Sequence, residues 1–101
     1  MMTLEEAELD LASAREDYTS ATCYLMALRF LRALDKAGLP LPAACADPDG
    51  EVSLDWCVSH RFSVSINAVG RLAYACSNGE HGNAHFRDEM IPDEIRKYLA
   101  S

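Results

Sequence analysis

The chain has 101 residues, which is enough for one domain with a single modest core. Half of the residues are hydrophobic and a quarter are charged, a composition that excludes an intrinsically disordered protein. Nine Lys and Arg residues stand against sixteen Asp and Glu residues, giving a formal net charge of -7. This balance argues against a protein that binds nucleic acid through a basic stripe of its own.

The N-terminal residues and the hydropathy indicate a cytoplasmic protein. The start, Met1 to Glu6, is acidic and lacks the basic and apolar regions of a signal peptide. No apolar run approaches the roughly 18 residues that span a bilayer. We therefore expect the cysteines to be reduced thiols that pack as small apolar groups: Cys23, Cys45, Cys57 and Cys76.

The first third of the chain is predicted to be helical. Thr3 and Glu6 have the spacing of a capping box, with Thr3 at the N-cap. No Gly or Pro follows until Gly38, which suits the position after a helix end, and Pro40 and Pro42 prevent continuation. The predicted helix therefore covers residues 4–37.

The length of this helix leaves two arrangements open. A continuous helix of this length measures roughly 50 Å, whereas a domain of this size is only about 26 Å across. Either the helix breaks near residues 17–20 and its first half folds back, or it stays straight and its projecting half pairs with a second subunit. We favour the straight helix and a homodimer, because no Gly or Pro marks a turn.

Strict two-residue alternation predicts an antiparallel β-meander in the second half of the chain. A turn at Asp47-Pro48-Asp49-Gly50 precedes three predicted strands at 51–57, 61–67 and 71–77, and a short fourth strand is expected at 84–87. Pro92 then begins a last helix, predicted at 92–100. The expected fold is α+β, with the long helix packed on a sheet of three or four strands in one domain.

Alternation also assigns the two faces of this sheet. One face is apolar and is expected to pack on the second half of the long helix: Val52, Leu54, Trp56, Phe62, Val64, Ile66, Leu72, Tyr74 and Cys76. The opposite face is flat, small and polar: Ser53, Asp55, Ser63, Ser65, Asn67, Arg71, Ala73 and Ala75. This second face is either simply solvated or a docking platform.

The cysteines and histidines raise the possibility of a metal site. Cys57, His60, Cys76 and His81 are expected at one end of the meander. Alternation, however, places Cys57 on the polar face and Cys76 on the apolar face, with a strand between them. Cysteine–histidine catalysis is disfavoured as well, because the neighbourhood is acidic and a thiolate needs a positive one. We therefore expect no metal, no cofactor and no catalytic residue.

The acidic side chains offer a different kind of site. Those of the N-terminal helix would face solvent and could contact a partner with a basic surface. Together with one acid of the polar sheet face, the predicted partner-binding residues are Glu5, Glu6, Glu8, Asp10, Glu16, Asp17 and Asp55.

Three segments of the meander resemble a group of small bacterial proteins that have no assigned activity. These segments are Asp47–Trp56, Arg61–Ile66 and Gly70–Ala75. The group is associated with accessory or mobile-element genes, so the resemblance implies a setting but no activity. In size and charge the chain is also similar to phage-encoded inhibitors such as anti-CRISPR proteins.

Two functions follow as hypotheses. The first is a non-enzymatic, acidic protein–protein interaction module, in one version an inhibitor of a nucleic-acid-handling complex. The alternative is a small metal-binding protein or cysteine–histidine enzyme that uses the Cys57, His60, Cys76 and His81 end of the sheet.

Overall fold

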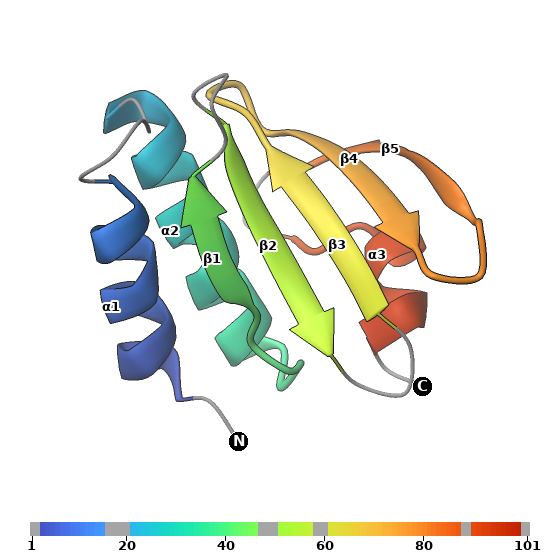
Figure 1. Cartoon of the computed structure of the whole chain (residues 1–101), viewed down its shortest axis with the longest axis horizontal. Coiled ribbons are helices and arrows are strands. Elements are labelled where there is room, and N and C mark those ends of the chain that lie inside the picture. Colours follow the sequence, from blue (N-terminus) through green and yellow to red (C-terminus); the bar gives the residue numbers. More distant parts are fainter. Residues whose placement is uncertain (1–2, 16–20, 47–50, 58–60, 88–89, 100–101) are drawn as a thin grey trace.

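Five strands and three helices make up the computed structural model, which describes residues 3–15, 21–46, 51–57, 61–87 and 90–99 (Figure 1). The helices are α1 (Leu4–Arg15), α2 (Ala21–Lys36) and α3 (Asp93–Leu99). The strands are β1 (Ala43–Ala46), β2 (Val52–Cys57), β3 (Arg61–Ile66), β4 (Arg71–Cys76) and β5 (His81–His85). All neighbouring strands are antiparallel and lie in chain order across one sheet. The predicted α+β class is confirmed.

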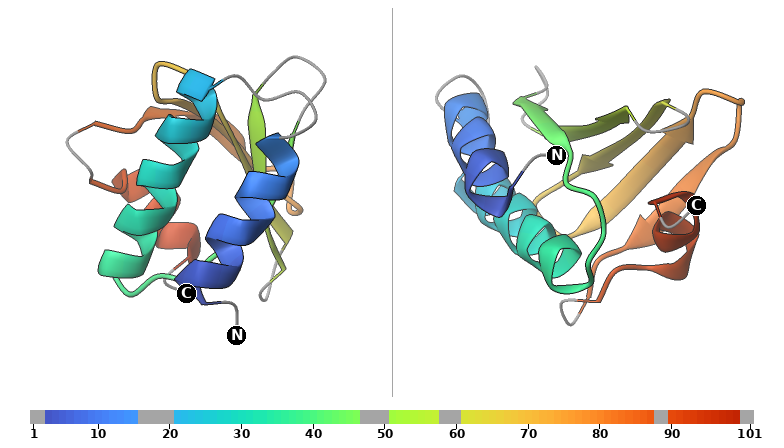
Figure 2. Two further views of the ribbon diagram at one scale, coloured as in Figure 1. Left: turned by 90° about the vertical axis from the view of Figure 1, so that its left-hand side faces the viewer. Right: turned by 90° about the horizontal axis from the view of Figure 1, so that it is seen from below.

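The helices leave one face of the sheet uncovered. In Figure 1, α2 and α3 lie behind the sheet, and α1 stands beside β1. The view from below shows α2 and α3 on the same side of the strands (Figure 2). We call the side that faces the viewer in Figure 1 the outer face. None of the helices in the described ranges is long and apolar enough to cross a membrane.

The N-terminal helical region consists of two helices. α1 ends at Arg15 and α2 begins at Ala21, and the two lie side by side (Figure 2). The favoured prediction of one straight helix is therefore wrong, and the alternative in which the first half folds back is confirmed. The physical reason is burial: Ala7 and Leu11 on α1 are fully buried, which a helix projecting from the domain would not allow.

The sheet has five strands, not the three or four predicted. β1 is absent from the predicted strands, because its Ala-Ala-Cys-Ala sequence does not alternate in polarity. It forms a strand because it pairs with β2 along its whole length. The fourth predicted strand, at 84–87, lies instead at 81–85 as β5. There the Tyr74 hydroxyl occupies the space beside Gly82, 2.6 Å from where a Cβ would lie, so glycine fits in this strand.

The core lies between α2 and the inner face of the sheet. Every residue predicted for the apolar face is buried, except Tyr74, which is half-buried. Trp56 is 2% exposed, and its indole N–H donates a 2.8 Å hydrogen bond to the carbonyl of Pro40, so the polar end of the buried ring is satisfied. α3 adds Ile95 and Leu99 to the same core.

A carboxylate of α1 covers part of the free edge of β1. Asp10 Oδ2 accepts a 2.7 Å hydrogen bond from the backbone N–H of Ala44, which points away from β2. Edge strands carry unpaired backbone groups that invite pairing with other chains. α1 and Asp10 together therefore close this side of the sheet.

The turn between β3 and β4 depends on two residues. Asn67 Oδ1 accepts hydrogen bonds from the backbone N–H groups of Val69 and Arg71, at 3.1 and 2.9 Å. Gly70 has a φ of +82°, and a Cβ at this position would lie 2.8 Å from the carbonyl oxygen of Phe86. A side chain at position 70 is thus excluded both by the backbone angle and by the close neighbour.

We predict that Gly70→Ala destabilises the protein by about 2–3 kcal/mol, because the left-handed backbone angle and the overlap with Phe86 act together. Gly79→Ala is the matched control, since Gly79 also has a positive φ but has nothing within 4 Å of a Cβ. This control should cost only about 1 kcal/mol. Urea unfolding of both variants measures the difference, and equal losses would contradict the role given to the Phe86 contact.

We also predict that Asp10→Ala costs about 1–3 kcal/mol, because it leaves the part-buried Ala44 N–H without an acceptor. Glu5→Ala, an exposed change on the same helix, should alter the free energy of unfolding by less than about 0.5 kcal/mol. Hydrogen exchange of the Ala44 amide is the specific readout. An unchanged exchange rate in Asp10→Ala would show that α1 does not protect this edge.

Candidate interaction surface

The outer face is built from two complete rows of side chains that cross all five strands. Strand pairing aligns one row of Ala43, Asp55, Ser63, Ala75 and His81. It aligns a second row of Cys45, Ser53, Ser65, Ala73 and Asn83. Five strands span about 19 Å at their usual spacing. The rows therefore form a continuous surface of mostly small side chains that runs from one edge of the sheet to the other.

A shallow depression lies at one end of this face. Its volume is about 210 Å³, and its lining is mostly polar: Glu51, Ser65, Asn67, Arg71, Ala73 and Asn83. A carboxylate and a guanidinium belong to this lining, so the depression presents both signs of charge. It offers hydrogen-bonding groups on an open surface rather than an enclosed cavity for a small ligand.

Asp55 lies within the outer face and has a neighbouring hydroxyl as a partner. The Ser63 hydroxyl donates a short hydrogen bond to Asp55 Oδ1 from the directly opposed position on β3. This bond links the two side chains across neighbouring strands. Asp55 is the predicted partner-binding residue that the structure places on the outer face.

The predicted acidic residues of α1 mostly make contacts within the chain. Glu6 Oε1 accepts hydrogen bonds from the backbone N–H and the hydroxyl of Thr3, which confirms the capping box. Glu8 forms a 2.9 Å ion pair with Arg32 of α2, and Asp10 binds the backbone of β1. Glu5 is exposed, and none of the described residues gives it a hydrogen bond or an ion pair. Glu16 and Asp17 lie outside the described residues.

The residues of the alternative metal or cysteine–histidine site are not brought together where they are described. Cys76 is buried on the core side of β4, whereas His81 is exposed on the outer face opposite Ala75. His60 and the side chain of Cys57 lie outside the described part of the chain. Among the described residues, no group of three or more His, Cys, Asp or Glu side chains could hold a metal ion.

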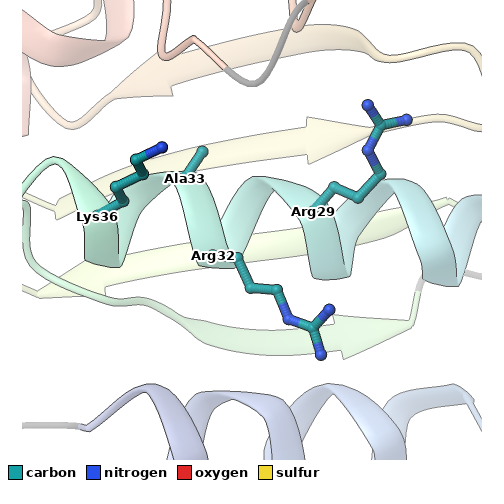
Figure 3. Close-up of a pocket in the computed structure, with 4 residues that line it drawn as sticks. All are labelled: Arg29, Arg32, Ala33 and Lys36. Atoms are coloured by element: carbon teal, nitrogen blue, oxygen red, sulfur yellow. The ribbon is translucent and has the colours of Figure 1, made fainter.

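A second hollow, of about 120 Å³, lies on the exposed side of α2 and is lined by Arg29, Arg32, Ala33 and Lys36. Figure 3 shows these basic side chains pointing in different directions, with Arg32 directed toward α1. Its guanidinium is already paired with Glu8 there. Because the cations diverge and one is used within the chain, the hollow does not form a converging site for an anion.

A hydroxyl–carboxylate pair joins α3 to the start of β5. The Tyr98 hydroxyl donates a 2.7 Å hydrogen bond to Glu80 Oε2. This bond, with a further one from Asn78, lowers the pKa of Glu80. The hydrogen bond to Glu80 also raises the pKa of Tyr98 to about 12. The hydrogen bond therefore stabilises the folded protein fully at pH values above the ordinary pKa of a glutamate, and this stabilisation is lost as the pH falls through the lowered pKa of Glu80. Tyr98 keeps its proton until the solution is strongly alkaline.

Alternation in the sequence predicts the central residues of the outer face but not those at its margins. Ala43 and Cys45 are missing from the prediction because no strand was predicted at 43–46, and His81 and Asn83 because the fourth strand was predicted at 84–87 instead of 81–85. The prediction rested on the alternation of apolar residues with small or polar ones in residues 51–77. This alternation does not extend into either edge strand, so it could not predict the margins of the face.

Comparison of the chain with models of protein families, with curated proteins and with solved structures finds no match. The resemblance to small bacterial proteins of mobile-element genes therefore stays a prediction.

We predict that Tyr98 remains protonated at a pH where an ordinary tyrosine, with a pKa near 10, ionises. The absorbance of tyrosinate at 295 nm should rise equally in the wild type and in Tyr98→Phe up to about pH 11, because Tyr98 does not contribute there. Glu80→Ala should bring the ionisation of Tyr98 down into this range. Far-UV circular dichroism checks that the fold persists. A smaller rise in Tyr98→Phe than in the wild type would contradict the pairing.

Proposed function

We propose that the protein is a non-enzymatic protein–protein interaction module, and that a protein partner docks on the outer face of its sheet. The observation that supports this most is the composition of the two rows. Solvent-facing positions of a sheet gain stability from β-branched, aromatic or oppositely charged cross-strand pairs. Here eight of the ten positions carry Ala, Ser, Asp or Asn, and only Cys45 and His81, both on edge strands, differ.

This composition works against the stability of the isolated sheet. Ala, Asp and Asn are depleted in strands, and small side chains contribute little cross-strand packing. Positions that break a local rule of stability without an evident structural gain are expected at functional sites. A role in docking would explain why small side chains are kept at these positions although they stabilise the sheet little.

Small side chains also lower the conformational-entropy cost of binding a partner. Ordering a Lys, Arg or Glu side chain at an interface costs about 1.5–2 kcal/mol, whereas Ala costs nothing. The Ala and Ser side chains of the two rows let the backbone of a partner approach closely, with the Ser hydroxyls and Asp55 offering hydrogen bonds.

The charge of the chain suggests the kind of partner. A net charge of -7 attracts proteins with basic surfaces and speeds their association at low ionic strength. The exposed cations Arg29, Arg32 and Lys36 belong to α2, which covers the opposite side of the sheet (Figures 1 and 3), while on the outer face Arg61 and Arg71 stand beside the acids Glu51 and Asp55. We therefore propose a partner with a basic surface, and in the narrower version an inhibitor of a nucleic-acid-handling complex, as anti-CRISPR proteins are.

The test is affinity capture with a variant that changes only the outer face. Ala73 is exposed in the second row, between Ser65 and Asn83. Ala73→Arg places a long charged side chain there and should abolish capture of a specific partner. Ala37→Arg, the same substitution at an exposed position after α2, is the matched control and should leave capture unchanged. Equal capture by both variants would exclude the outer face as the docking surface.

The salt dependence of capture tests the nature of the partner separately. Raising the salt from about 50 mM to 500 mM shortens the Debye length several-fold and should weaken capture of a basic partner. For the inhibitor version, the captured protein should bind nucleic acid, and the wild-type chain, but not Ala73→Arg, should reduce that binding. Capture that does not depend on salt would remove the charge-based part of the proposal.

A further inference from the structure

The two edges of the sheet differ in how they are closed. At the β1 edge, α1 lies alongside the strand and Asp10 takes up the backbone N–H of Ala44 (Figure 1). At the other edge, β4 is the only described element that pairs with β5. On the opposite side of β5, no strand of the described ranges pairs with its backbone groups.

Hydrogen bonds at both ends of β5 establish which residues face outward. The Phe86 N–H donates to the Gly70 carbonyl at 2.8 Å, and the Cys76 N–H donates to the Glu80 carbonyl at 2.7 Å. In an antiparallel ladder, alternate residues point toward the same neighbour. Gly82 and Ala84 thus bond to β4, while the N–H and C=O groups of His81, Asn83 and His85 point away from the sheet. No described residue supplies partners to these outward groups.

The sequence of β5 lacks the usual protection of an edge. Natural edge strands carry Lys, Pro, a bulge or an inward charge that blocks pairing with another chain. β5 reads His-Gly-Asn-Ala-His, and its register with β4 is continuous from His81 to His85. An extended, unprotected strand of this kind is a template for a further antiparallel strand.

We propose that β5 pairs with β5 of a second copy of this chain, in an antiparallel arrangement whose two-fold axis passes between the two Asn83 residues. In this register His81 lies opposite His85 of the partner subunit, and the three outward residues of each strand satisfy one another. An isologous contact of this kind closes as a dimer. The two five-stranded sheets become one continuous sheet.

The strand is self-complementary in this register. On the outer face the paired side chains are imidazoles and amides, so no Lys, Arg, Asp or Glu side chain of β5 faces another across the axis. On the core side Gly82 lies opposite Ala84 of the partner subunit, and neither side chain is large enough to block close approach. The polar faces of both copies point the same way, so the two outer faces join into one surface. The dimer does not depend on the function proposed for that surface.

Light scattering and sedimentation across a concentration series test the dimer. The wild type should dimerise, and Asn83→Pro should raise the dissociation constant at least tenfold, because proline removes only an outward N–H and leaves the bonds to β4 intact. Asn83→Ser keeps this N–H and should dimerise like the wild type. Circular dichroism confirms that each variant is folded. A monomeric wild type, or a dimer that Asn83→Pro leaves unchanged, would overturn the proposal.

A disulfide trap gives a test that does not rely on the proline variant. In a background with Cys45→Ser and Cys57→Ser, Asn83→Cys should form a cross-linked dimer on oxidation, because facing residues of a hydrogen-bonded pair have Cα atoms about 5.5 Å apart, within disulfide range. Ala75→Cys, one strand further in, is the matched control, since its counterpart in the partner would lie about 20 Å away, three strand spacings across the sheet and four residues along it. Equal cross-linking by both variants would overturn the proposed register even if a dimer exists.

Discussion

One constraint shapes the whole molecule: every strand of the sheet buries the same side. The side chains of β2, β3 and β4 that point inward, with Phe62, Val64 and Ile66 in the central strand, are buried against α2 and α3. A shift of one residue in any strand would turn its apolar side chains to solvent, so the register is strongly determined. Because the core residues of the sheet all lie on its inner face, the outer face needs no large apolar side chains and can carry small ones.

The same one-sided burial explains the arrangement of the N-terminal helices. α2 covers the core face, but β1 has a free edge and α1 has an apolar stripe that needs covering. Placing α1 beside both α2 and β1 satisfies these requirements together: Ala7 and Leu11 are buried, Glu8 pairs with Arg32, and Asp10 binds the edge. β5, at the opposite end of the sheet, has no comparable cover among the described elements, which makes the two ends of the molecule unlike.

Periodicity in the sequence predicted the three central strands, their faces and the core position of Trp56, because a buried face leaves a direct record in the order of residues. It failed where tertiary contacts override local preference. β1 is a strand because of its pairing, and β5 contains Gly82 because Tyr74 fills the space beside it. For the site, the middle of the outer face was predicted but its margins were not. The partners of Glu8 and Asp10 lie 24 and 34 residues away, so no local pattern could reveal them.

Thiol labelling at two adjacent positions of β3 tests this partition of the sheet most directly. In a background with Cys45→Ser and Cys57→Ser, Ser65→Cys should react with a thiol reagent in the folded protein, because position 65 is on the outer face and half-buried. Val64→Cys should react only as fast as the protein unfolds, because Val64 is fully buried. Similar native-state rates at the two positions, or the reverse order, would contradict the one-sided core on which the docking surface depends.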